Sequence, residues 1–152
     1  MIKLDNKTIT RLHEDLINQG NAVKIMAQGN SMHPFIRKND VVIAKKITPN
    51  ILMTGDIILF KKKDTFIIHR LVKVLNKKVG SIYFTKGDAN THCEILSGKN
   101  ILAKIVGRQR NNTFISLEEK KWQIYAKFIL IKRAVLAFLK SLKLAPLVVA
   151  SF

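Results

Sequence analysis

Ser31 is a candidate nucleophile because of the residues that surround it. It lies in residues 27–34, between Gly29, which permits backbone angles closed to other residues, and Pro34, which disfavours a helical conformation at the residue before it. This spacing predicts a rigid, irregular turn that presents the hydroxyl. A serine becomes reactive when a base removes its proton and a third group orients that base. Without such partners, the same residues are typical of a structural polar turn.

His69 is the candidate base. It lies in residues 66–72, which are otherwise mostly apolar and predict a strand. Because the unperturbed pKa of an imidazole is about 6.5, a histidine can accept a proton near neutral pH without strong desolvation. Taken alone, a histidine in a strand is more often a structural hydrogen-bonding group.

Two carboxylates in one polar stretch are candidates for the third group. Asp88 and Glu94 both lie in residues 85–94, after a predicted strand. Either could accept the second ring N–H of His69, which would fix its tautomer and stabilise the imidazolium. Asp88 has an alternative role in bracing the loop, because aspartate side chains bond nearby backbone amides.

The rest of the pattern predicts the elements that hold these residues. Short runs rich in β-branched and aromatic residues predict strands, and turn residues separate the runs. The predicted strands are residues 23–26, 41–44, 57–60, 66–74, 82–85 and 101–106. Because no long helix separates them, we expect a mainly β (α+β) fold built on an antiparallel sheet.

A helix is predicted on each side of this sheet. Apolar residues at helical spacing, between a cap at Asp5 or Asn6 and a stop at Gly20, predict a short amphipathic helix that covers the core. His13 lies on its polar, solvated face, and we assign it no function. Residues 116–119 have the form of a capping box and predict the start of a long helix.

The second helix is predicted to be basic and amphipathic. Its later part places Lys132, Arg133, Lys140 and Lys143 opposite Leu130, Ile131, Val135, Phe138 and Leu142. Lysines interrupt it too often for a membrane span, whereas the two faces suit the plane of an anionic bilayer surface. Packing on the domain or on another protomer is the alternative. Pro146 is expected to end or kink the helix before the apolar tail 147–152.

Length and composition limit the classes of protein. At 152 residues we expect one folded unit, with an N-terminal helix (1–20), a β catalytic domain (21–112) and a C-terminal helix and tail (113–152). The net charge of +17 attracts polyanions, whether nucleic acid or a membrane surface. The single cysteine, Cys93, excludes an internal disulfide, and we expect no metal and no cofactor.

Four motifs in fixed order carry a resemblance to a known family. They are Gly29-Asn30-Ser31-Met32-His33-Pro34, Gly55-Asp56-Ile57-Ile58-Leu59-Phe60, Ile68-His69-Arg70-Leu71-Val72 and Lys86-Gly87-Asp88-Ala89-Asn90. Together they resemble the type I signal peptidases over residues 23–107. The bacterial housekeeping branch has a lysine as base. Histidine followed by arginine is similar to the branch of the endoplasmic reticulum, archaea and some Gram-positive bacteria.

The resemblance implies a function for each matching residue. Ser31 would be the nucleophile, His69 the base and Arg70 a structural neighbour. The family's catalytic aspartate follows the Gly-Asp-x-Asn motif, and the corresponding position here carries Glu94. Either Glu94 serves, Asp88 replaces it, or the enzyme is impaired. Gly29 offers no side-chain hydroxyl to an oxyanion hole, which leaves mainly the Ser31 N–H.

The expected partners are a peptide or preprotein substrate, bound as an added strand, and an anionic membrane surface; we do not expect nucleic acid. Because the sequence shows no N-terminal anchor or signal peptide, we expect a peripheral membrane protein, with the cytoplasmic face favoured.

One alternative belongs to a different class of protein, and a second one is nearer to a peptidase. The same β fold could serve as a non-catalytic module that binds membranes or nucleic acid, using Lys61-Lys62-Lys63 and the terminal helix. A self-cleaving repressor shares the serine turn, but it has a lysine base and a preceding DNA-binding domain, neither of which is found here.

Overall fold

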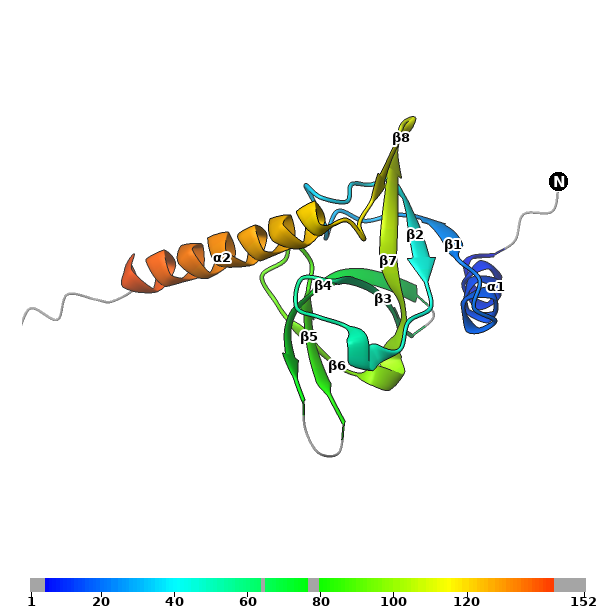
Figure 1. Ribbon diagram of the computed structural model, residues 1–152, viewed down its shortest axis with the longest axis horizontal. Helices are drawn as coiled ribbons and strands as arrows, with labels where there is room; N and C mark the ends of the chain where they lie inside the picture. Colours follow the sequence, from blue (N-terminus) through cyan, green and yellow to red (C-terminus); the bar gives the residue numbers. More distant parts are fainter. Residues whose placement is uncertain (1–4, 64, 77–79, 144–152) are drawn as a thin grey trace, which may run out of the picture.

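The computed structural model describes residues 5–63, 65–76 and 80–143. One antiparallel sheet with a helix on each side dominates these residues (Figure 1). The elements are α1 (Asn6–Asn18), β1 (Val23–Met26), β2 (Val41–Lys45), β3 (Ile57–Lys62), β4 (Thr65–Leu75), β5 (Ile82–Lys86), β6 (Glu94–Ser97), β7 (Ile101–Arg110), β8 (Thr113–Ser116) and α2 (Lys120–Lys143). The predicted mainly β, antiparallel fold is confirmed.

The strand order within the sheet brings distant segments together. It runs β1-β2-β7-β3-β4-β5-β6, with β8 paired to β7. Long β7 therefore lies between β2 and β3, and β4 lies between β3 and β5. Strands β1 and β6 form the two ends of this order, so each has one edge that pairs with no other described strand.

The sheet has an apolar core on both faces. All of Ile57, Ile58, Leu59 and Phe60 in β3 are buried, and successive side chains of a strand point to opposite faces. Ile57 and Leu59 belong to one cluster, and Ile58 and Phe60 to the other. An uninterrupted apolar run is the pattern of a strand that is covered on both sides. Strand β4 pairs with β3, so its residues alternate between the same two environments.

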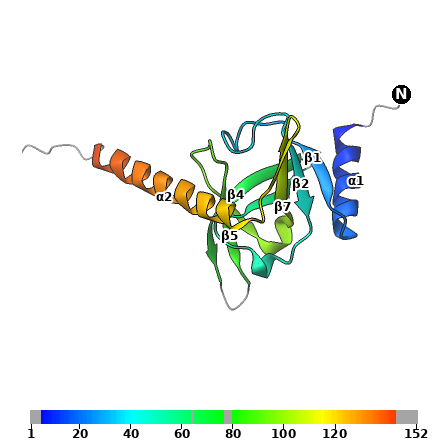
Figure 2. The same ribbon diagram turned by 45° about the horizontal axis from the view of Figure 1, so that its top comes forward.

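Helix α1 begins and ends as its sequence predicts. The Asp5 side chain accepts a hydrogen bond of 2.9 Å from Thr8 N, which caps the helix. Gly20 follows the helix with a φ of 91°, a value that favours glycine. Ile17 is fully buried in the core with Val23 of β1, and α1 lies beside β1 in both ribbon views (Figure 2).

The six predicted strands are all present, but two further strands were missed. Strand β6 (Glu94–Ser97) extends the sheet beyond β5, and β8 (Thr113–Ser116) pairs with β7. The predicted helix start at residues 116–119 was wrong by a few residues. Ser116 still pairs with Gly107, and Leu117 N donates a hydrogen bond of 2.8 Å to Val106 O, so α2 begins at Lys120.

Helix α2 extends away from the sheet (Figures 1 and 2). Its first turns contact the body through Trp122 and Tyr125, whose rings lie 5.7 and 5.4 Å from the ring of Phe35. None of the helices in the described part of the chain combines the length and apolar character that a membrane crossing needs. Pro146 and the tail 147–152 lie outside the described residues.

Candidate active site

The predicted nucleophile and base line one cleft of about 610 Å³. Ser31 and His69 lie on its wall together with Asn90. The remaining lining comes from α1, β1, β4 and the serine turn: Ile9, Thr10, His13, Ile25, Met26, Ala27, Gln28, Gly29, Met32, Ile36, Thr65, Phe66, Ile67 and Ile68. The cleft is thus largely apolar, with polar side chains interspersed among the apolar ones.

His13 faces this cleft, in contrast to the solvated face predicted for it. Its ring stacks on Phe66 at 6.3 Å, and burial lowers the pKa of its imidazole. Together with Ile9 and Thr10 it makes α1 one wall of the cleft. Helix periodicity identified α1 but gave no indication of what its polar face approaches.

The serine turn is anchored by buried residues on its C-terminal side. Met32, Phe35 and Ile36 are all buried, and Ile36 N donates a hydrogen bond of 2.9 Å to Met32 O. The peptide bond between His33 and Pro34 is cis. Ser31 itself is half-buried at the cleft. The expected irregular turn is therefore present, and core packing fixes its position.

Two arginines of β7 brace this turn, and sequence analysis did not identify them. Arg110 donates to both oxygens of buried Asp40, at 2.8 and 2.7 Å. Arg108 and Arg110 both donate to the carbonyl oxygen of Phe35. Arg37 N also donates to Asp40, at 2.8 Å. A buried carboxylate needs such partners, but Asp40 and Arg110 lie 70 residues apart, and pattern alone does not pair them.

Gly87 packs against the backbone of Ser31. A Cβ atom at Gly87 would lie 2.6 Å from the carbonyl oxygen of Ser31 and 2.8 Å from Nδ2 of Asn90. The amide two residues later, Ala89 N, donates a hydrogen bond of 2.7 Å to the same Ser31 oxygen. The Gly-Asp-x-Asn motif therefore contacts the serine turn directly, and glycine is required by this close approach.

His69 is buried within β4. Its ring lies 5.8 Å from Phe60 in an edge arrangement, and its side chain is 8% exposed. Burial lowers the pKa of His69 below 6.5, although the nearby carboxylates of Glu94 and Asp88 partly oppose this effect. The imidazole is therefore neutral near pH 7, the form that can accept a proton.

Glu94 is the carboxylate that contacts His69. Its Oε2 lies 2.9 Å from Nδ1 of His69, a hydrogen-bonding distance, with an angle outside the range of a well-aligned bond. Its Oε1 accepts a hydrogen bond of 2.7 Å from Nζ of Lys62. Burial raises the pKa of Glu94, but Lys62 and His69 outweigh burial, and the net pKa lies below its usual value. Lys62 was not predicted at this site.

Asp88 binds Arg70 with both carboxylate oxygens. The two hydrogen bonds measure 3.0 and 2.7 Å, and both side chains are almost fully buried. Arg70 also donates to the carbonyl oxygen of Gly55 at 3.0 Å. The pair therefore joins three of the four motifs, with Gly55 at a φ of 102° in the turn before β3.

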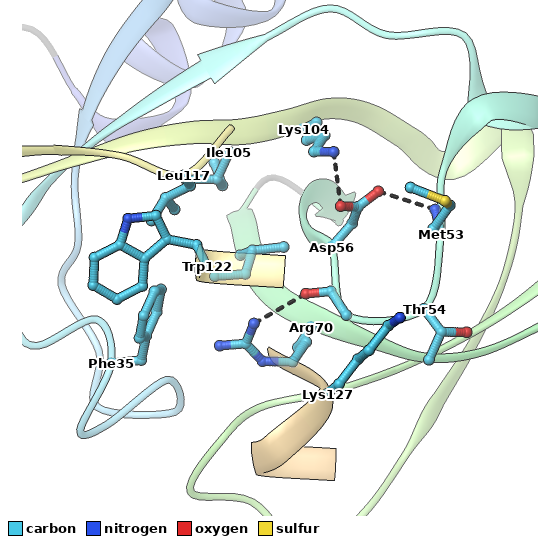
Figure 3. Close-up of a pocket in the computed structure, with 12 residues that line it drawn as sticks. Phe35, Met53, Thr54, Asp56, Arg70, Lys104, Ile105, Leu117, Trp122 and Lys127 are labelled. Atoms are coloured by element: carbon cyan, nitrogen blue, oxygen red, sulfur yellow. Dashed lines mark hydrogen bonds and ion pairs between the residues drawn. The ribbon is translucent and has the colours of Figure 1, made fainter. Parts of the chain in front are cut away.

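A second pocket of about 270 Å³ lies beside Arg70, beneath the first turns of α2 (Figure 3). Figure 3 shows Trp122 next to Phe35 at one side and the Asp56 carboxylate at the other. Asp56 accepts a hydrogen bond from Met53 N and pairs with Lys104 Nζ at 2.7 Å. Within the described ranges, no group of three His, Cys, Asp or Glu side chains could hold a metal ion.

Comparison with known proteins identifies a family and several relatives. The sequence model of the family described as Peptidase S24-like matches residues 2–109. The catalytic subunit SEC11C of the signal peptidase complex is 33% identical over 94 residues in Homo sapiens, Canis lupus familiaris and Mus musculus. In each case the match covers 57% of this chain and 49% of the relative, so this chain spans about half the length of these relatives.

Proposed function

The chain belongs to the peptidase S24-like family, and from this premise we propose that it is a serine endopeptidase that cleaves a signal, leader or precursor peptide. Ser31 is the nucleophile, His69 the general base and Glu94 the group that orients His69. The observation that carries the proposal is the shared cleft of Ser31 and His69, with Glu94 at Nδ1 of the histidine.

The chemistry follows from these positions. Because Nδ1 faces Glu94, Nε2 is the nitrogen available to take the proton of Ser31 as Oγ attacks the scissile carbonyl carbon. The protonated ring then gives that proton to the leaving amine, and an acyl-enzyme remains. A water molecule, activated by His69, hydrolyses the ester. The Ser31 N–H supports the oxyanion.

The substrate is an extended segment that binds along β1. Strand β1 ends the sheet order, and it leads through Ala27 directly to the serine turn. Met26, Gln28 and Gly29 line the cleft on the way to Ser31. An added strand on this edge would lead the scissile bond to the hydroxyl, and its side chains would enter the apolar cleft.

Asp88 has a structural role in this proposal. Both of its oxygens bind Arg70, so it holds the loop of Gly87 against the serine turn. Glu94 replaces the family's aspartate, as the sequence resemblance suggested.

Helix α2 is proposed to lie on an anionic membrane surface. Ile124, Phe128, Ile131, Val135 and Phe138 recur at spacings of four and three residues and are 51% to 68% exposed. Such an apolar stripe, on a chain with a net charge of +17, suits the boundary between lipid headgroups and acyl chains. The protein would then be a peripheral membrane peptidase.

A serine-reactive phosphonate tests the catalytic proposal. The wild-type protein should be labelled at Ser31, as located by mass spectrometry, and Ser31→Ala should lose both the label and peptide cleavage. Ser81→Ala is the matched control, because Ser81 lies outside the cleft and its hydroxyl donates to Asn76. Equal labelling of wild type and Ser31→Ala would refute catalysis by Ser31 and favour the non-catalytic binding module.

A further inference from the structure

We infer that Thr85 is a positioning residue of the active site: its buried hydroxyl is placed to donate a hydrogen bond to Oε2 of Glu94 and so to hold that carboxylate against His69. The inference rests on the proposed function. It identifies the group that fixes the acid partner.

Strand register places the three residues on one face of the sheet. Glu94 of β6 lies directly opposite Thr85 of β5, and Thr85 lies opposite Leu71 of β4. His69 is two residues before Leu71, so both side chains point to the same face. Directly opposite residues in antiparallel strands also share a face, with their Cβ atoms about 5 Å apart. Thr85 is therefore the nearest cross-strand neighbour of Glu94 on the side of His69.

Burial leaves the hydroxyl of Thr85 in need of a partner. The residue is fully buried, and among the described residues its Oγ1 makes no hydrogen bond. Its neighbours on this face, Leu71 and Tyr83, belong to the apolar cluster under β3 to β5. A buried hydroxyl without a partner is costly, and valine would fill the same space without that cost. A polar partner within reach of the hydroxyl would offset this cost.

Oε2 of Glu94 can accept a further hydrogen bond. Its Oε1 is bound to Lys62, whereas Oε2 is buried and has the contact with His69 as its one close polar contact within the described residues. A carboxylate oxygen can accept more than one hydrogen bond, and an ionised carboxylate has no proton to donate. Thr85 can donate. The two groups are therefore complementary.

The length of the Glu94 side chain makes such support useful. Strands β6 and β4 are separated by β5, a distance of about 9 to 10 Å between their axes. The Glu94 side chain must therefore extend across β5 to contact His69. A long side chain can adopt several rotamers, and not all of them make this contact. Thr85 lies on β5, between the two residues. A hydrogen bond from its hydroxyl would favour the Glu94 rotamer that faces the His69 ring.

Thr85→Val and Thr85→Ser test this role, with cleavage of a fluorogenic peptide as the readout. Thr85→Val should lower kcat about tenfold, with a smaller change in KM, and Thr85→Ser should recover most of the loss. In a Glu94→Gln background, Thr85→Val should cause little further loss, because the two residues act as a unit. If Thr85→Val does not fold, the comparison of Thr85→Ala with Thr85→Ser provides the same contrast.

The outcomes separate this inference from the proposed function. Loss of activity in Ser31→Ala with unchanged kcat in Thr85→Val would overturn the role of Thr85 alone. If Thr85→Val lowers kcat by the same factor in the wild-type and Glu94→Gln backgrounds, the inference would also be overturned, because the effect of Thr85 would then be independent of Glu94. Full activity in Ser31→Ala would overturn the catalytic proposal itself.

Discussion

Nδ1 of His69 lies 2.9 Å from Oε2 of Glu94, whereas Asp88, six residues earlier, binds Arg70 with both of its oxygens. His69 and Arg70 are consecutive in β4 and point to opposite faces of the sheet. Each therefore meets a different carboxylate of the same polar stretch. His69 and Arg70 thus have separate carboxylate partners, as the proposed roles of Glu94 and Asp88 require.

Glu94→Gln should reduce kcat/KM by about a hundredfold to ten-thousandfold, because an amide neither stabilises the imidazolium nor fixes the correct tautomer. Glu94→Asp should also be impaired, since its side chain is shorter by one methylene and must span the same two strand spacings. Steady-state cleavage of a fluorogenic peptide measures both variants. Full activity in Glu94→Gln would indicate a Ser31–His69 dyad that needs no acid.

Peptide cleavage should persist at pH values below the ordinary histidine pKa of 6.5. Burial lowers the pKa of His69 below 6.5, and only the neutral ring accepts a proton from Ser31. As pH falls through that lowered pKa, kcat/KM should decline, while Glu94 stays ionised because its own pKa is also lowered. A profile of kcat/KM on both sides of pH 6.5 checks this. A midpoint above 6.5 would contradict the neutral, buried base.

The same shift has a consequence for stability. The unfolded chain binds a proton at His69 at a higher pH than the native protein does, so the free energy of unfolding should fall as pH drops below 6.5. Urea unfolding at several pH values measures this slope. His69→Gln should have a shallower slope over that interval, and an unchanged slope would show that other groups cause it.

Asp88→Asn should destabilise the protein by about 3 kcal/mol, because it leaves the buried Arg70 guanidinium without its counter-charge. Urea unfolding gives the free energy, and cleavage should be measured at a temperature where the variant is folded. Most activity should remain in the folded variant. Abolished cleavage with unchanged stability would instead make Asp88 the acid partner of His69.

Gly87→Ala should lower kcat strongly, by about a hundredfold. Its Cβ atom would lie only 2.6 Å from the carbonyl oxygen of Ser31, so the Ser31 backbone would have to shift and the proposed nucleophile would move with it. Gly98→Ala is the comparison variant. Its Cβ would meet a Pro49 side-chain atom at 3.3 Å, away from the cleft, so cleavage should be retained. Equal activity of the two variants would show that the Gly87 contact does not set the position of Ser31.

Replacing Ile131 and Phe138 by serine should weaken binding to anionic liposomes about tenfold or more, because each removes a large exposed apolar side chain from the α2 stripe. Flotation with anionic and neutral vesicles measures binding, and neutral vesicles should bind less. Ile95→Ser, at an exposed site on β6, is the control. Unchanged flotation of the double variant would exclude α2 as the contact surface.

The sequence predicted the sheet, because β-branched runs and turn residues are local signals. The resemblance of four ordered motifs to a family suggested Ser31 and His69 together, and the two residues line one cleft. The sequence left the choice between Glu94 and Asp88 open, because the strand register that brings Glu94 to His69 is not a local pattern. Strand β6 was not predicted, because its residues alternate between half-buried and exposed and do not form a strong apolar run. The ion pair of Arg110 with Asp40 forms because β7 packs against the segment that follows the serine turn. A local sequence pattern does not predict this long-range contact.

Phe35 connects the serine turn with α2, because it follows Ser31 by four residues and its ring contacts both Trp122 and Tyr125. Trp122 is the single tryptophan of the chain. Its fluorescence is thus an intrinsic optical reporter of the junction between α2 and the rest of the domain. A change at this junction can be followed through one emission signal, without any attached dye.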